Sequence, residues 1–434
     1  MPSGGPEQHH LSLTNEVDSV VVVSFVSATN WTGSSGGGAL CTFGAGPAGG
    51  TLDQRSVGDQ NYTYHADDWE GTLWRTQLRG LTPSTVYTYN CGGPTSFTFT
   101  SPKSRGALPV TVGIVADLGA YSNRDDHGDG NQTIEALIDA AKQGSLDAIV
   151  HAGDIAYTSG NQPVWDRYFR EVEAAAAIVP YQVAPGNHES YANFSGYRHR
   201  FAMASLNNSE IAVDEGITGS GPNGMGVNNL VHAFTVGAVG FVALSTEKYA
   251  DFTPGSTTHA LVEDALAGFA VARVAANDVT IQWIVVFTHH PLYCSTNDEN
   301  DCERVCAEST RPNLHPLLAK YGVDMYVAGH LHNYERSYPI GDMNGTLTAH
   351  GKSYVWDGTT GVKGVMHIVA GQAGDDEGLT DDWVDQPEWS AFRNATLGWN
   401  RFTALNATHA LFEYVSSLDG SIVDSAMLVK PAGK

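Results

Sequence analysis

The stretch Ala-Ile-Val-His-Ala-Gly-Asp-Ile-Ala-Tyr, residues 148–157, decides the fold of the larger part of this chain. A short apolar run ends at a glycine, and the next residue is Asp154. This pattern predicts a buried strand followed by a loop that presents a carboxylate. Similar runs occur elsewhere and are separated by stretches with helical spacing, which predicts βαβ units. The expected helices cover 132–142, 165–177, 260–275 and 314–320; the expected strands cover 110–116, 148–151, 181–184, 281–288, 324–327 and 365–369, with a hairpin at 230–245.

Short polar clusters follow five of these strands. In an α/β sheet, the loops at the carboxyl ends of strands converge on one crevice, so residues far apart in sequence can share a site. Each cluster alone is ordinary, because a Gly-Asp pair is usually a turn and a histidine at a strand end is more often structural than a ligand. Five clusters in succession favour a common site. They are Asp117-Leu118-Gly119, Gly153-Asp154-Ile155-Ala156-Tyr157, Gly186-Asn187-His188-Glu189, Thr288-His289-His290-Pro291 and Gly329-His330-Leu331-His332.

The side chains in these clusters are those that bind hard or borderline metal ions: carboxylates, an amide oxygen, imidazoles and a phenol, without a cysteine. His330 and His332 stand two apart on an extended segment, so they face the same side and can serve adjacent ions. Glycines precede Asp154, Asn187 and His330, and we expect them to let the backbone turn sharply where a ligand projects. The sequence therefore predicts a metal centre.

The N-terminal part of the chain follows a different pattern. From residue 10 to about residue 100, short β-rich segments alternate with Gly-containing and polar turns, which predicts an antiparallel sandwich. Within it, residues 81–87 resemble the turn and tyrosine strand of a fibronectin type III domain. Residues 101–106 form a plausible linker. We therefore expect a sandwich domain over 1–105 and a catalytic domain over 106–434.

Charge and composition exclude several classes of function. The 434 residues include 23 Lys+Arg and 47 Asp+Glu, and the formal charge of −24 repels polyphosphate backbones and anionic membrane surfaces. We therefore expect no nucleic-acid or membrane partner, and a bound metal must supply positive charge if the substrate is an anion. No run approaches the roughly 18 apolar residues of a membrane span, and residues 1–10 lack the pattern of a signal peptide.

Sequons and cysteines favour the secretory route. Eight Asn-x-Ser/Thr sequons are more than a cytosolic protein usually carries, so N-glycans are expected. From the placement of the five cysteines we predict a Cys41–Cys91 disulfide and a second disulfide within a trio near residue 300. The remaining thiol is either free and buried or joins two chains, so a monomer and a homodimer both stay open. The trio is Cys294, Cys302 and Cys306, and the sequons are at Asn30, Asn61, Asn131, Asn193, Asn207, Asn344, Asn394 and Asn406.

The five polar clusters together resemble a known superfamily, because they match, in order, those of the calcineurin-like metallophosphoesterases. In that superfamily the first cluster has the form Asp-x-His and the second ends in Asp, whereas here Gly119 and Tyr157 stand at those positions. This exchange is similar to the pattern of purple acid phosphatases, whose tyrosinate binds ferric iron and gives the colour. The leading sandwich, residues 245–247 and the tail around 406–409 also resemble the plant and fungal two-domain members, so the resemblance covers nearly the whole chain.

The resemblance implies an α/β fold and a set of site residues. The expected architecture is a fibronectin type III-like β-sandwich followed by a metallophosphoesterase α/β sandwich, in which helices flank two mixed β-sheets. Carried over residue by residue, the ligands of ferric iron are Asp117, Asp154, Tyr157 and His332, and those of a divalent ion (zinc, manganese or ferrous iron) are Asp154, Asn187, His289 and His330, with Asp154 bridging. The catalytic candidates are His188, which would contact phosphate or protonate the leaving alkoxide with Glu189 orienting it, and His290, which either lines the pocket or packs in its loop.

The expected activity is that of a secreted acid phosphatase acting on small phosphorylated substrates. It would hydrolyse phosphate monoesters to an alcohol and inorganic phosphate, with a metal-bound hydroxide as the nucleophile. Because a trivalent ion lowers the pKa of bound water more than a divalent ion does, an acidic optimum is expected. Nucleotides, phytate and phosphodiesters stay open as substrates, and the vacuole, the cell wall and the medium stay open as locations. The rival hypothesis is a secreted binding module whose metal domain is inactive.

Overall fold

The computed structural model describes most of the chain. The described residues are 2, 4–14, 18–32, 40–66, 69–120, 130–203, 229–247, 250–274, 280–297, 310–341, 352–355 and 364–431. The sequons at Asn207 and Asn344 and the cysteines Cys302 and Cys306 lie outside these ranges. None of the described helices combines the length and the apolar character that a membrane crossing requires.

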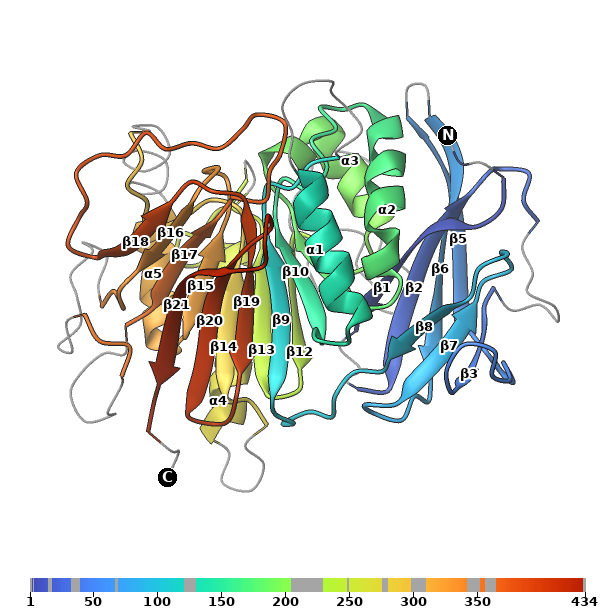
Figure 1. Cartoon of the computed structure of the whole chain (residues 1–434), viewed down its shortest axis with the longest axis horizontal. Coiled ribbons are helices and arrows are strands. Elements are labelled where there is room, and N and C mark those ends of the chain that lie inside the picture. The colour runs from blue at the N-terminus through green and yellow to red at the C-terminus, as the bar shows by residue number, and fades with distance from the viewer. Residues whose placement is uncertain are drawn as a thin grey trace.

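The N-terminal region is a β-sandwich, as the sequence predicts (Figure 1). Its two sheets have four strands each, in the orders β1-β2-β6-β5 and β4-β3-β7-β8. Val23 and Phe25 from the first sheet pack against Phe43, Tyr87 and Tyr89 from the second, so an apolar core holds the sheets together. The strands are β1 (Glu7–Leu13), β2 (Val20–Ser27), β3 (Thr42–Ala45), β4 (Gln54–Arg55), β5 (Val57–Ala66), β6 (Trp69–Arg79), β7 (Val86–Asn90) and β8 (Phe97–Thr100).

Two local contacts brace the second sheet of the sandwich. Cys41 and Cys91 form the predicted disulfide, which joins the start of β3 to the end of its neighbour β7. The Tyr87 hydroxyl accepts a hydrogen bond of 3.0 Å from the backbone N–H of Thr82, the contact typical of a tyrosine corner in such sandwiches. Cys294 is also disulfide-bonded, as predicted for one of the trio, and its partner lies outside the described residues.

The rest of the described chain forms two mixed sheets that pack face to face through one apolar core (Figure 1). The six-stranded sheet has the order β11-β10-β9-β19-β20-β21, and the seven-stranded sheet has the order β12-β13-β14-β15-β17-β16-β18. Their strands are β9 (Val110–Val115), β10 (Ala148–Ala152), β11 (Tyr181–Ala184), β12 (Val231–Val236), β13 (Val239–Leu244), β14 (Trp283–Phe287), β15 (Met325–Ala328), β16 (Tyr334–Ser337), β17 (Met366–Ala370), β18 (Ser390–Asn394), β19 (Gly398–Ala404), β20 (His409–Ser416) and β21 (Ile422–Val429).

Helices cover the outer faces of both sheets, as predicted. Those on the six-stranded sheet are α1 (Gly130–Lys142), α2 (Gln162–Ala176) and α3 (Tyr191–Arg200), and those on the seven-stranded sheet are α4 (Thr257–Val274) and α5 (Arg311–Lys320); a short 3₁₀ turn, η2, spans Asn187–Glu189. In Figure 1 the first three helices lie between the six-stranded sheet and the sandwich. Both faces of the sheets are therefore buried along much of their length.

Burial on both faces explains the apolar runs in the sequence. In β9, Val112 and Ile114 face the core between the sheets, whereas Val115 faces the helices. In β10, Val150 faces the core between the sheets and Ile149 faces the helices. Strands of this kind need apolar residues at every position rather than at alternate ones.

The last three strands were not predicted. β19 pairs antiparallel with β9, so that Asn400 lies opposite Ile114, and β20 and β21 extend the same sheet. β19 begins with Gly398 and mixes polar with apolar residues, a weak strand signal. Its pairing with a strand nearly three hundred residues earlier is a long-range contact that local patterns do not reveal.

The sandwich is tied to the helices of the second domain by buried polar contacts. The Arg75 guanidinium on β6 donates hydrogen bonds of 2.7 Å to the backbone carbonyls of His199 and Phe201, at the end of α3. Trp69 Nε1 donates to Asp166 Oδ2 at 2.7 Å, and Arg200 Nη1 lies 3.1 Å from Asp166 Oδ1. Because buried charges are costly unless paired, these contacts fix one relative position of the two parts.

His10 at this interface makes the stability of the fold depend on pH. Its ring packs 4.8 Å from the ring of Phe169, and Nε2 lies 3.1 Å from the carbonyl of Arg200. Burial, helped by the charge of Arg75, lowers the pKa of His10 from 6.5 to about 4. The unfolded chain therefore binds the proton first as the pH falls, and the stability contributed by the neutral ring is lost between pH 6.5 and 4.

We predict that His10→Gln flattens the dependence of the unfolding free energy on pH within this window. The lost contribution amounts to about 3 kcal/mol in the wild type. Urea unfolding curves at several pH values between 4 and 7 would measure it. Equal slopes in the two proteins would contradict the prediction, even if the variant is less stable at every pH.

Candidate metal centre

The five polar clusters meet at one end of the paired sheets. They follow β9, β10, β11, β14 and β15, and each of these strands runs parallel to a neighbour. The backbone N–H of His330, from the seven-stranded sheet, donates to Asp117 Oδ2, from the six-stranded sheet, at 2.9 Å. Residues from both sheets therefore contribute to a single site.

Asp117, Tyr157 and His332 form the first candidate ligand group. The Tyr157 hydroxyl lies 3.2 Å from Asp117 Oδ1 and 3.0 Å from His332 Nε2. His332 Nδ1 is 3.1 Å from the carbonyl of Gly378, to which it must be the donor, so Nε2 is left with its lone pair directed at this group. One carboxylate, one phenol and one imidazole thus converge.

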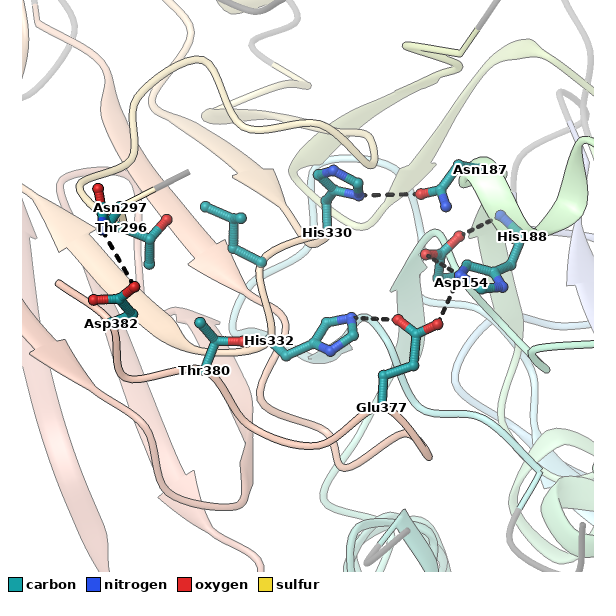
Figure 2. A pocket seen from close by; sticks show the side chains of 11 residues that line it. Asp154, Asn187, His188, Thr296, Asn297, His330, His332, Glu377, Thr380 and Asp382 are labelled. Atoms are coloured by element: carbon teal, nitrogen blue, oxygen red, sulfur yellow. Dashed lines mark hydrogen bonds and ion pairs between the residues drawn. The ribbon is translucent and has the colours of Figure 1, made fainter. Parts of the chain in front are cut away.

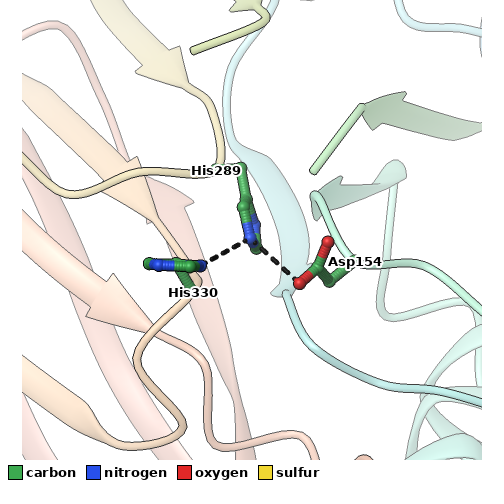
Figure 3. A group of neighbouring side chains, drawn as sticks. All are labelled: Asp154, His289 and His330. Atoms are coloured by element: carbon green, nitrogen blue, oxygen red, sulfur yellow. Dashed lines mark hydrogen bonds and ion pairs between the residues drawn. The ribbon is translucent and has the colours of Figure 1, made fainter. Parts of the chain in front are cut away.

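Asp154, His289 and His330 lie together (Figure 3), and with Asn187 beside the two histidines they form the second candidate ligand group. His289 Nε2 lies 3.0 Å from Asp154 Oδ2 and 2.9 Å from Asn187 Oδ1. His330 Nδ1 lies 3.0 Å from Asn187 Oδ1 and 3.2 Å from His289 Nε2. The structure therefore brings together all four residues that the resemblance assigns to the divalent ion.

The chemistry of these donors fits a cation. The amide oxygen of Asn187 and the carboxylate of Asp154 only accept, and each neutral imidazole has one nitrogen that only accepts. His289 Nε2 and His330 Nδ1 nevertheless face each other at 3.2 Å. A metal ion placed among them would accept an electron pair from every one of these atoms.

The buried carboxylates show the same need for positive charge. Burial and the nearby charge of Asp154 raise the pKa of Asp117 to about 7. Burial opposes ionisation of Asp154 too, but the charge of His289 outweighs it and lowers the pKa of Asp154. Burial likewise opposes the charge on His289, yet the attraction of Asp154 raises the pKa of His289 to about 9. Positive charge at this position therefore favours the ionised form of Asp154.

The backbone is strained where it presents the ligands. Asp117, Asp154, Tyr157 and His330 have φ angles of 56°, 50°, 50° and 73°, in the left-handed region that non-glycine residues avoid. Four candidate ligands in this conformation indicate that the surrounding structure imposes it. Strain of this kind is typical of sites whose geometry serves a function.

The glycines before the ligands act in two different ways. Gly153 has a φ angle of 87°, so it supplies the expected sharp turn. Gly186 has a φ angle of −111°, which any residue can adopt, and its role is steric, because a Cβ atom there would overlap Asp154 Oδ1. A Cβ atom at Gly329 would overlap Asp117 Oδ2. The expectation of a sharp turn is therefore wrong for Gly186 and for Gly329, neither of which has a positive φ angle.

His188 stands beside both ligand groups. Its ring lies 4.2 Å from the ring of Tyr157, and its backbone N–H donates to Asp154 Oδ1 at 2.9 Å. Glu189 does not orient it as expected: the Glu189 carboxylate accepts hydrogen bonds from the backbone N–H groups of Ile155 and Gly186, at 2.9 and 2.8 Å. Glu189 instead ties the second and third ligand loops together.

A cleft of about 320 Å³ opens onto these residues (Figure 2). Its described lining combines candidate ligands and His188 with polar side chains from the continuation of the fourth loop and from the loop after β17, and none of these lining residues is Lys or Arg. A phosphate entering the cleft would thus depend on metal ions and histidines for positive charge. The lining residues are Asp154, Asn187, His188, Thr296, Asn297, His330, Leu331, His332, Glu377, Thr380 and Asp382.

Three family models match successive parts of the chain. They are "Purple acid Phosphatase, N-terminal domain" over 6–105, "Calcineurin-like phosphoesterase" over 110–334 and "Iron/zinc purple acid phosphatase-like protein C" over 364–425. The calcineurin-like model alone covers more than half of the chain, and the human protein "Acid phosphatase type 7" is 31% identical over 99% of this chain and 92% of its own length. The chain belongs to the purple acid phosphatase family.

Two further comparisons agree with the family. The Arabidopsis thaliana protein "Probable purple acid phosphatase 20" is 28% identical over 94% of this chain and 84% of its own length. The structure of the purple acid phosphatase PPD1 from yellow lupin (Lupinus luteus) seeds matches with a TM-score of 0.79 at 23% identity, covering 98% of this chain and 75% of that one. The lupin match concerns the fold alone.

Gly119 stands where the wider superfamily has a histidine, and its backbone conformation suits glycine. Its φ angle is 72°, in the left-handed region that side chains disfavour. A Cβ atom there would make ordinary van der Waals contacts with the ring of Tyr157 at 3.6 Å and with Cα of Asp375 at 3.4 Å. A phenol takes the place of an imidazole in the first ligand group.

Sequence reasoning missed a sixth loop at the site. Glu377, after β17, is half exposed and lines the cleft, with Oε1 3.6 Å from His188 Nε2 and Oε2 3.9 Å from His332 Nε2. Asp375 supports the loop, since its Oδ1 accepts the backbone N–H of Glu377 at 2.7 Å. The available signal was the Gly-Asp-Asp-Glu-Gly run at 374–378, after a strand that was predicted.

His290 lies beside the ligand His289 but outside the described lining of the cleft. Its Nε2 is 3.2 Å from Glu247 Oε1, and the His290 side chain is 13% exposed. Of the two positions left open by the sequence, packing within the loop is the one that the structure shows. A direct catalytic role for His290 has no support in this geometry.

We predict that Gly186→Ala lowers the metal content of the purified protein. The backbone conformation suits alanine, so the added Cβ acts chiefly by displacing Asp154, and a loss of metal affinity of about 10- to 100-fold is expected. Elemental analysis after dialysis would measure it. The matched change Gly268→Ala, in α4 with open space around the Cβ position, should leave the metal content unchanged. Equal metal contents in both variants would contradict the steric role.

Proposed function

We propose that this purple acid phosphatase family member hydrolyses phosphate monoesters to an alcohol and inorganic phosphate at a dinuclear metal centre. The observation that supports the proposal is that two candidate ligand groups each contribute side chains to the lining of one cleft. Both groups use oxygen and nitrogen donors, as metal-dependent phosphoesterases require. A binding module without activity would not need to maintain two complete groups beneath a cleft.

We assign ferric iron to the first group and a divalent ion, zinc, manganese or ferrous iron, to the second, with Asp154 shared. A hard trivalent ion suits the carboxylate of Asp117 and the phenol of Tyr157. Burial and the surrounding carboxylates raise the pKa of Tyr157 well above 10, so only a strongly polarising cation would hold the tyrosinate. When bound, the two ions supply positive charge for the phosphate and lower the pKa of the attacking water.

His188 is the proposed proton donor to the leaving alkoxide. It lies at the cleft wall with 18% of its side chain exposed, and Glu377 stands 3.6 Å away, where a carboxylate can hold a protonated imidazole. Asp154 Oδ1 fixes the backbone of His188 and Asp154 Oδ2 faces His289. Asp154 therefore holds the proposed proton donor next to the ligand group at which the phosphate would bind.

The polarity of the cleft favours some substrates over others. Glu377 and Asp382 place carboxylates in its described lining, without a Lys or Arg to balance them. Leaving groups that carry several further phosphates, as in phytate, would meet repulsion there. Small monoesters with a neutral leaving group suit this lining better, and we expect an acidic optimum, as a ferric site implies.

We propose that the protein enters the secretory pathway and carries N-glycans. The Cys41–Cys91 disulfide is a bond that persists in oxidising compartments. Asn30, Asn61 and Asn406 are exposed sequon positions, accessible to a glycosyltransferase. Vacuole, cell wall and medium are all compatible with these two features.

The test of the metal assignment is elemental analysis and visible absorption of wild type and Tyr157→Phe. We expect iron with a second divalent metal in the wild type, a violet band, and hydrolysis of p-nitrophenyl phosphate that is fastest below neutral pH. The variant should lose the band because the phenolate is gone. A colourless, iron-free wild type that is inactive at every pH would overturn the proposal.

The role of His188 predicts a dependence on the leaving group. His188→Asn should lower kcat by about 10²- to 10⁴-fold for an alkyl phosphate, whose alkoxide needs a proton. The loss should be much smaller for p-nitrophenyl phosphate, since p-nitrophenolate leaves without one. Steady-state kinetics with both substrates would measure the two ratios. Equal losses would show that His188 serves binding or folding and does not donate the proton.

A further inference from the structure

His290 and Glu247 form a buried pair next to the second ligand group. His290 Nε2 lies 3.2 Å from Glu247 Oε1, and the two side chains are 13% and 7% exposed. Neither residue belongs to the described lining of the cleft, so neither is placed to contact a substrate. Burying a carboxylate is costly unless a partner and hydrogen bonds compensate it. The burial of this pair therefore indicates a role other than keeping the surface soluble.

Several hydrogen bonds hold the pair in one position. Thr246 Oγ1 accepts the backbone N–H of His290 at 2.9 Å and the hydroxyl of Thr288 at 2.9 Å. The Tyr326 hydroxyl donates to the carbonyl of His290, also at 2.9 Å. These contacts join the loops after β13 and β14, which are parallel neighbours, to β15. The backbone of His290 is thus held by contacts from three strands, and the 3.2 Å approach of Glu247 Oε1 to Nε2 adds a contact to the ring.

The fixed ring of His290 packs directly against a candidate ligand. The ring centroids of His290 and His330 are 4.1 Å apart, with an angle of 51° between the planes. His330 has a φ angle of 73°, so its backbone is strained and does not by itself favour the observed position. Its Nδ1 must nevertheless face Asn187 and His289 at 3.0 and 3.2 Å. The ring of His290 forms a wall that limits the movement of His330.

We propose that Glu247 and His290 act as a positioning pair that holds His330 in the geometry required by the divalent ion. The inference rests on the dinuclear centre proposed above and assigns His290 a role outside the chemical step. Glu247 fixes the His290 ring, and the ring in turn fixes the imidazole of His330. The ring of His290 packs on the second ligand group, whereas Asp117, Tyr157 and His332 contact one another, so the ion of the first group should be affected much less.

The inference can be tested because it predicts faster release of only one of the two ions. The purified, metal-loaded full chain is incubated with excess EDTA, desalted at intervals and analysed for iron and for the divalent metal. We expect His290→Ala and Glu247→Ala to release the divalent metal about 10- to 100-fold faster than the wild type, with iron and the violet band retained. Glu247→Gln keeps the size of the side chain and an oxygen that can face His290 Nε2, and should be within about threefold of the wild type.

The matched control is another histidine and glutamate pair, within α4. His259 Nδ1 lies 3.8 Å from Glu263 Oε2, the two side chains are 12% and 30% exposed, and neither residue belongs to a ligand loop, so His259→Ala should release both metals as the wild type does. If His290→Ala does not fold, His290→Gln, which keeps a donor for Glu247 and lacks the aromatic ring, takes its place together with Glu247→Ala.

The outcomes separate the inference from the proposed function. Selective release of the divalent metal supports the positioning pair. Release of both metals together in the variants, or release at the wild-type rate, overturns it while leaving the dinuclear centre intact. A wild type that does not hold two metals overturns the proposed function, and the positioning pair falls with it.

Discussion

Electron pairs that face one another across the ligand loops are the constraint on which the rest of this structure depends. His289 Nε2 has Asn187 Oδ1, Asp154 Oδ2 and His330 Nδ1 within 3.2 Å, and most of these atoms can only accept. Such an arrangement is unfavourable in an apolar interior unless a cation or a proton lies among these atoms. The scaffold must therefore impose it, and the binding of metal then releases the repulsion.

The conformation of the ligand loops shows how the scaffold imposes this arrangement. Left-handed backbone at Asp117, Asp154 and His330 would relax if the strands were not anchored in two packed sheets. Glu189 adds a link between loops, because its buried carboxylate accepts two backbone N–H groups from different ligand clusters, and burial with the charge of Asp154 raises its pKa to about 8. A neutral Glu189 would still accept these hydrogen bonds, so the link between the two ligand loops persists at low pH.

Features recorded in short stretches of sequence could be predicted, and features that depend on tertiary contacts could not. Apolar strands with polar ends predicted the five polar clusters and the strands that they follow, since each signal lies within about ten residues, whereas the two-sheet architecture and the ligand assignments came from the family resemblance. The strands after residue 390 were missed because β19 is specified by its pairing with β9. The position of His290 was left open because only the structure shows Glu247 beside it. Glu377 was missed because a glycine-rich acidic run usually forms a solvated turn.

The sandwich acquires a structural role once α3 is considered. This helix follows directly on the loop of Asn187 and His188, and its first turn contains left-handed residues at 192–194, so it does not stabilise itself as a regular helix does. Its end is held from the sandwich by Arg75, which donates to two of its terminal carbonyls. No residue of the sandwich belongs to the described lining of the cleft. The sandwich therefore acts on the site at a distance, by anchoring the far end of the segment that carries the proposed proton donor.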